Sequence, residues 1–157
     1  MVRIFYFIIT FTLSPLYMVA QNESELAEII KECLLSYDRN MNVEDVSRNG
    51  QCEKYVCKDN LPPFFSYSAT PEMIYFSLDN ISVIPKIIRK KMSHGLQVLF
   101  VEYQLNGSQL QVAIFRKSVR KNRNKINIGT GDWTTFFYEF SCENLNWQLK
   151  DVKHHGI

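Results

Sequence analysis

The sequence predicts an α+β domain in which an N-terminal helix and a short second helix pack on a curved antiparallel sheet of about four or five strands. Apolar residues recur at helical spacing early in the chain, a short basic segment follows Pro85, and the last third alternates between apolar and polar residues with short connections. The chain has 157 residues, of which 46% are hydrophobic and 22% are charged, and this length and composition are typical of one globular domain. They argue against a disordered tail or a multidomain enzyme.

Residues 1–20 have the pattern of a secretory signal peptide. Arg3 precedes an apolar run at residues 4–13, and the chain turns polar directly after Ala20. A membrane anchor is the less favoured alternative, because the run is about half of the ~20 residues that a bilayer requires. We therefore expect cleavage after Ala20, a single secreted domain at residues 21–157, no membrane span, and an extracellular location.

The first element of the mature chain is expected to be a helix near residues 23–38. Asn22 and Glu25 have the spacing of a capping box. Apolar residues then recur at helical spacing, at Leu26, Ile29, Ile30, Cys33, Leu34 and Tyr37. Residues 51–71 are expected to be irregular, since Pro62 and Pro63 withhold backbone donors from helix and sheet alike.

The second half of the chain is expected to supply the sheet. Residues 73–83 alternate as a strand, and Pro85 suits the first turn of a basic helix at residues 86–93 that Gly95 ends. Residues 96–105 form an apolar strand, Asn106 and Gly107 are a hairpin signal, and a returning strand follows. A basic, asparagine-rich connection then leads to strands at residues 133–142 and from Trp147 onward.

The order of elements and the closing segments resemble a known fold family. The segments are Tyr138-Glu139-Phe140-Ser141-Cys142 and Asn146-Trp147-Gln148-Leu149-Lys150. They are similar to the nuclear-transport-factor-2-like, or cystatin-like, cone domains, especially the small secreted members. The resemblance covers nearly the whole mature chain and is one of topology; the stretch at residues 51–71 departs from it. It implies a cone whose central pocket is an active site in some members and is filled in others.

Export would give a role to the cysteines and to the glycosylation sequons. The mature chain would keep four cysteines, Cys33, Cys52, Cys57 and Cys142. An oxidising compartment favours two disulfides, and four cysteines allow three connectivities. We prefer Cys52 with Cys57 and Cys33 with Cys142; zinc is disfavoured because Cys-x4-Cys lacks a second cysteine pair. N-glycans are expected at the sequons of Asn22, Asn80 and Asn106.

No catalytic residue, metal or cofactor is expected. Acidic and tyrosine side chains in the predicted strands could serve acid–base catalysis, namely Asp79, Glu102, Tyr103, Tyr138 and Glu139. Nothing in the sequence pairs them, and strand alternation is equally compatible with outward-facing carboxylates. The histidines at positions 94, 154 and 155 lack a third ligand at a useful spacing.

The densest charge lies in residues 116–125. Six cations occur there, Arg116, Lys117, Arg120, Lys121, Arg123 and Lys125. They suit a sulfated glycan or an acidic extracellular protein. The alternative is a solvated hairpin tip whose charges keep strand edges from pairing with other chains. Nucleic acid is not expected, because export removes the usual target and no aromatic residues interleave the charges.

The sequence therefore predicts a secreted, glycosylated, disulfide-stabilised binding or interaction protein without catalytic activity. One alternative is a cystatin-like inhibitor of cysteine proteases, although residues 97–101 lack the spacing and glycine of Gln-x-Val-x-Gly. Another is a small-ligand enzyme on the cone fold. That alternative requires a solvent-connected cavity lined by at least two convergent polar groups.

Overall fold

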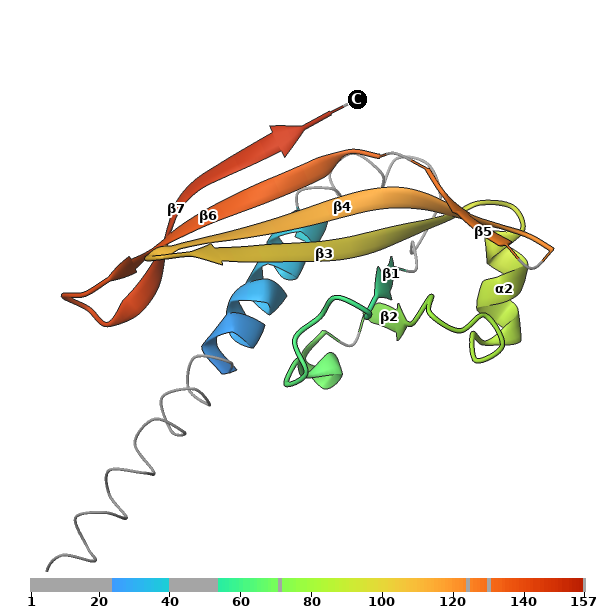
Figure 1. Cartoon of the computed structure of the whole chain (residues 1–157), viewed down its shortest axis with the longest axis horizontal. Helices are drawn as coiled ribbons and strands as arrows, with labels where there is room; N and C mark the ends of the chain where they lie inside the picture. The colour runs from blue at the N-terminus through green and yellow to red at the C-terminus, as the bar shows by residue number, and fades with distance from the viewer. Residues whose placement is uncertain (1–23, 40–53, 71, 124, 130, 157) are drawn as a thin grey trace, which may run out of the picture.

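A computed structural model describes residues 24–39, 54–70, 72–123, 125–129 and 131–156 of the chain. Within these ranges, two α-helices and a seven-stranded, mostly antiparallel and curved sheet form an α+β fold (Figure 1). The expected class and both expected helices are confirmed, but the sheet has more strands than we expected. The signal peptide, the Asn22 sequon and Cys52 lie outside the described residues.

The N-terminal helix spans residues 24–39. The elements that follow are β1 (Lys54–Cys57), a 3-10 helix (Tyr67–Ala69), β2 (Met73–Phe76), α2 (Lys86–Met92), β3 (Leu96–Asn106), β4 (Gln109–Asn122), β5 (Lys125–Ile128), β6 (Trp133–Ser141) and β7 (Asn146–His155). The strand order in the sheet is β2-β1-β3-β4-β6-β7, and β5 pairs with the far end of β4. All pairs from β3 to β7 are antiparallel, whereas β1 runs parallel to both β2 and β3.

The irregular segment expected at residues 51–71 contains β1, so that expectation was wrong for Lys54–Cys57. Three of these four residues are buried. The sequence of a strand with parallel partners on both sides is a short apolar run without alternation. Hydrophobic periodicity therefore does not identify such a strand. The strand expected at residues 73–83 ends early, at Phe76. Beyond it, the Leu78 N–H donates to the Asp59 carboxylate at 2.8 Å, which ties the chain to a loop instead of a neighbouring strand.

The basic connection expected after the hairpin is also regular structure. β4 continues to Asn122, and β5 returns from Lys125 to pair with it. Val119 explains why, because it is fully buried and pairs with Leu96 of β3 on one side and Ile128 of β5 on the other. A buried apolar residue inside a charged run thus holds the run in the sheet.

The main core lies between the N-terminal helix and the sheet. Ile30 and Leu34 of the helix are fully buried, as are Val112, Ile114 and Phe136 of β4 and β6. Burial of this stripe stabilises the helix, as the helical spacing predicted. Apolar side chains from both layers therefore occupy the interface between the helix and the strands.

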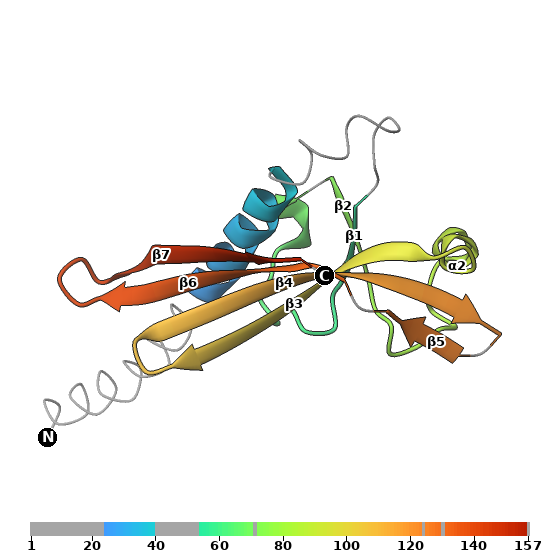
Figure 2. The ribbon, with the colours of Figure 1, turned by 90° about the horizontal axis from the view of Figure 1, so that it is seen from above.

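A second core lies on the opposite face of β3. Met92 of α2, Val98 of β3 and Val119 of β4 are fully buried there, whereas Leu99 belongs to the main core. Adjacent residues of a strand point to opposite faces, so β3 is covered on both. Figures 1 and 2 show the N-terminal helix against the middle of the sheet and α2 at the end where β4 meets β5.

Two glycines mark the connections that the sequence predicted. Gly95 follows α2 with a φ of 94°, and Gly107 turns the β3–β4 hairpin with a φ of 61°. Glycine adopts this left-handed conformation without a steric penalty. Among the described ranges, no helix combines the length and apolar character that crossing a bilayer requires.

Candidate functional site

The most distinctive surface is a basic end formed by α2, the last part of β4, and β5. Figure 2 shows α2 and β5 at the same end of the molecule. The basic end is defined here by Lys86, Arg89, Lys90, Lys91, Arg120, Lys121, Arg123 and Lys125. Between residues 85 and 129 the sequence has a single acid, Glu102, and it lies on the side of β3 toward the hairpin. This stretch of the sequence therefore carries far more positive than negative charge.

Two of the six predicted cations are used by the fold instead. Arg116 Nε donates to Asp132 Oδ1 at 2.8 Å, and Asp132 Oδ2 also accepts from the Tyr37 hydroxyl at 3.1 Å. This arrangement ties the end of the N-terminal helix to β4 and to the start of β6. Because both charges are internally compensated, Arg116 has little to offer an external anion.

Lys117 is also engaged, on the opposite face of β4. Its Nζ lies 4.5 Å from the ring centroid of Phe115 and 5.3 Å from that of Phe100, and it is 3.8 Å from Glu102 Oε1. Such cation–aromatic contacts stabilise a cation in place. Trp133 stacks on Phe115 with a centroid distance of 6.0 Å. Lys117 therefore belongs to an aromatic row that crosses the sheet.

The remaining four predicted cations stay together at the basic end. Arg120, Arg123 and Lys125 are exposed, and Lys121 is half-buried. None of the four has an ion-pair partner among the described residues. They surround the turn between β4 and β5, where Arg123 has a φ of 53°. Four of the six predicted cations therefore lie near one turn, and their role in binding a polyanion remains a prediction.

Sequence reasoning missed the contribution of α2. Lys86 and Lys90 are exposed on its outer side and have no ion-pair partner in the described part of the chain. Lys91 instead donates to the Tyr55 hydroxyl at 2.8 Å. A strand start and a strand end meet in an antiparallel pair, so the helix before β3 lies beside the end of β4. The available signal was the run of cations in α2 together with the short connection at Gly95.

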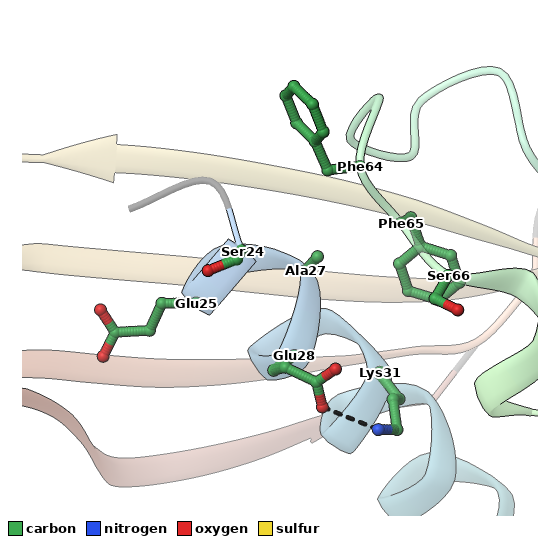
Figure 3. A pocket seen from close by; sticks show the side chains of 8 residues that line it. All are labelled: Ser24, Glu25, Ala27, Glu28, Lys31, Phe64, Phe65 and Ser66. Carbon is green, nitrogen blue, oxygen red and sulfur yellow. Dashed lines mark hydrogen bonds and ion pairs between the residues drawn. The ribbon is translucent and has the colours of Figure 1, made fainter. Parts of the chain in front are cut away.

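A second feature is a groove of about 290 Å³ between the N-terminal helix and the loop before the 3-10 helix (Figure 3). It is lined by Ser24, Glu25, Ala27, Glu28, Lys31, Phe64, Phe65 and Ser66. Ala27 and Phe65 are buried and make its apolar floor, whereas Phe64 is 64% exposed at its rim. Lys31 Nζ donates to Glu28 Oε2 at 2.7 Å along the helix. The groove combines an apolar floor with carboxylates, which suits a ligand that has an apolar group next to a cation.

The possible acid–base residues do not converge. Glu102 pairs across from Ala113, and Glu139 from Gln109, at separate places on one face of the sheet. Tyr138 lies on the other face, where its hydroxyl is 3.4 Å from Cys33 Sγ and burial raises its pKa. Tyr103 is 39% exposed on that face, and Asp79 is exposed in the loop after β2. These positions do not assemble a proton-transfer site.

The cysteines described here have free thiols. Cys33 and Cys57 are buried and Cys142 is exposed. Neither the preferred bond between Cys33 and Cys142 nor the one expected for Cys57 is therefore formed in this structure. Burial raises the pKa of Cys33 and of Cys57 to about 12 in each case. Deep burial keeps both in the unreactive thiol form.

The other predicted positions are dispersed. The sequon residues Asn80 and Asn106 are exposed at opposite ends of the sheet region, before α2 and at the β3–β4 turn. His94 follows α2, His154 Nδ1 is 2.9 Å from the Thr134 hydroxyl, and His155 stacks on Trp133. Among the residues described, no three histidine, cysteine or acidic side chains are grouped to hold a metal ion.

Comparison of the chain with protein-family models, with curated proteins and with solved structures finds no match.

Proposed function

We propose that this chain is a secreted, glycosylated binding protein that holds a sulfated glycan at its basic end and catalyses no reaction. The observation that carries the proposal is that cations from two separate segments, with no ion-pair partner among the described residues, lie at one end of the molecule. They are Lys86 and Lys90 of α2 with Arg120, Lys121, Arg123 and Lys125 of β4 and β5. The signal-peptide pattern and the sequons support an extracellular ligand.

The physical basis is multivalency. A single exposed ion pair contributes only about 0.2–1 kcal/mol, so several must act together to hold a ligand. A sulfated polysaccharide offers a repeating row of anions, and the six cations offer a matching cluster. Salt screens exposed charges over about 10 Å at 0.1 M, so binding should weaken steeply as ionic strength rises.

Elution from a heparin column tests the proposal. A hairpin variant with Lys121→Gln, Arg123→Gln and Lys125→Gln should elute at clearly lower salt than the unmodified chain. An equal-charge control changes Lys58, Lys150 and Lys153 to Gln, since these exposed lysines lie away from the basic end. The control should elute near the unmodified chain.

The pattern of elution decides between a site and a general charge effect. If the control shifts as much as the hairpin variant, retention reflects net charge and the proposed site is wrong. A second variant with Lys86→Gln and Lys90→Gln tests whether α2 contributes, and its elution should also shift. Unchanged elution of both variants would reject the glycan.

Export is tested separately on protein collected from the medium of secreting eukaryotic cells. We expect the amino terminus to be Gln21, and we expect enzymatic removal of N-glycans to lower the mass. An intact Met1 in a cytosolic product would contradict the extracellular part of the proposal. That outcome would leave the heparin result to be judged on its own.

A further inference from the structure

Two exposed apolar side chains lie in opposite electrostatic surroundings. Ile87 of α2 is 65% exposed and lies between Lys86 and Lys90 in sequence. Phe64 is 64% exposed at the rim of the groove that Glu25 and Glu28 also line. Each of these apolar side chains has charged neighbours, and the lysines beside Ile87 are opposite in sign to the glutamates beside Phe64.

The loop that carries Phe64 is held in place by its neighbours. Pro62 and Pro63 restrict the backbone, and the Phe65 N–H donates to the Pro62 carbonyl at 3.0 Å. The Phe65 ring is 4% exposed and packs against Tyr75 with a centroid distance of 5.8 Å. With Phe65 fixed inward, Phe64 is presented outward, as Figure 3 shows. A loop whose backbone is already held in place loses little conformational freedom on binding.

Ile87 is presented in the same way by α2. Ile88 and Met92 anchor the helix, with exposed fractions of 3% and 0%. Lys86 and Lys90 are four residues apart, so they lie on one side of the helix, and Ile87 borders that side. The result is an aliphatic side chain with two cations on one side of it.

We propose that Ile87 of one copy of the chain enters the Phe64 groove of a second copy. Its side chain would contact Phe64 and the floor made by Ala27 and Phe65. Lys86 and Lys90 would then face the carboxylates of Glu25 and Glu28. Glu28 engages Lys31 through Oε2, and among the described residues Oε1 has no hydrogen-bond or ion-pair partner, so it can face a second cation. Apolar and charge complementarity both favour this occupant.

The two surfaces differ, so the contact is head-to-tail. Each copy in a pair still has one unused groove or one unused Ile87, and further copies can add. A contact built on one side chain and two ion pairs is small, and small interfaces are weak and transient. Association should therefore rise with concentration and fall with salt.

Sedimentation velocity of the exported chain from about 5 to 500 µM tests the proposal. The mean sedimentation coefficient should increase across this range for the unmodified chain. Phe64→Ser and Ile87→Ser should each remain monomeric, because each removes one half of the contact. Leu145→Ser is the matched control, since Leu145 is 75% exposed in the β6–β7 turn, and it should associate like the unmodified chain.

Mixing the two defective variants gives the sharpest result. Phe64→Ser retains Ile87, and Ile87→Ser retains the groove, so an equimolar mixture should form dimers and nothing larger. A mixture that stays monomeric, or an unmodified chain that is monomeric throughout the range, overturns the proposal. The same loss of association in Leu145→Ser would do so as well.

This inference goes beyond glycan binding and does not rest on it. Phe64→Ser should lose association and keep its heparin elution, whereas the hairpin variant at positions 121, 123 and 125 should show the opposite. If the variant with Lys86→Gln and Lys90→Gln elutes earlier from heparin, soluble heparin should also dissociate the unmodified chain, because these two lysines serve both contacts. In that case, association that is indifferent to saturating heparin would overturn the proposal.

Discussion

Replacing Asp132 by Asn would test how the N-terminal helix is fixed to the sheet. The Asp132 carboxylate accepts from Arg116 Nε at 2.8 Å and from the Tyr37 hydroxyl at 3.1 Å. Asn keeps the shape but removes the negative charge and presents a donor where one of the acceptors was. Arg116 can then donate only to a neutral carbonyl, and the Tyr37 hydroxyl must accept from the new amide N–H instead of donating, so both charge-assisted hydrogen bonds are lost.

The size of the stability loss depends on how far the Arg116 and Asp132 side chains are exposed to water. Hydrogen bonds to charged groups contribute about 1.5–3 kcal/mol each when well shielded. The Arg116 and Asp132 side chains are 33% and 29% exposed, so water screens part of this interaction. We expect Asp132→Asn to lower the free energy of unfolding by about 2 kcal/mol, and the melting temperature by roughly 6–10 °C for a domain of this size.

Urea unfolding followed by tryptophan fluorescence measures the change. Tyr37→Phe should cost about 1 kcal/mol, and the double variant with Asp132→Asn should cost less than the sum, because both changes remove the same hydrogen bond. Asp151→Asn is the control on exposed β7 and should stay within about 0.5 kcal/mol. Strict additivity of Tyr37→Phe and Asp132→Asn, or an unchanged stability of Asp132→Asn, would refute the assigned tie.

Three further predictions concern the core, the thiols and acid stability. Phe136→Ala should lower the free energy of unfolding in urea by about 3–5 kcal/mol, since Phe136 is only 1% exposed in the main core. In native protein, iodoacetamide should alkylate exposed Cys142 and spare Cys33, because burial raises the pKa of Cys33 to about 12. If the cysteines of denatured protein react with iodoacetamide only after a reductant is added, they form the disulfide that the sequence predicted. Burial alone would raise the pKa of Asp59, but hydrogen bonds, among them one from the Leu78 N–H, outweigh it and lower that pKa. The stability that Asp59 contributes is therefore present above the pKa that Asp59 has in the unfolded chain, and it is lost as pH falls through the lower folded value. Asp59→Asn should therefore reduce the loss of unfolding free energy over this acidic range. Urea titrations at a series of pH values measure this loss.

The sequence was informative wherever a pattern was local. The helical stripe around Ile30, the Asn106–Gly107 turn and the stop at Gly95 each depend on residues within one element. β1 could not be recognised in this way. Its four residues become a strand because β2 and β3 pair with them from later in the chain. Pairing between distant segments leaves no periodic trace in so short a run.

The basic segment also shows what a local pattern can predict and what depends on tertiary structure. Charge density alone pointed to one end of the molecule, and it treated six cations as equivalent. Strand alternation separates them, since Arg116 and Lys117 point to opposite faces and find Asp132 and Glu102. Only the recognition that β4 continues through the charged run would have revealed this separation. The part played by Lys86 and Lys90 needed the tertiary placement of α2.

The distribution of charge, rather than its sum, is what a polyanion would detect. The formal net charge of the chain is only +2 at pH 7, so uniform attraction to heparin should be weak. Acids of the N-terminal helix, such as Glu25 and Glu28, lie at the groove and cannot neutralise α2 or the β4–β5 turn. Strong retention by heparin would therefore report the clustering of cations at the basic end. An equal-charge variant separates the two explanations, because it changes the sum and leaves the cluster intact.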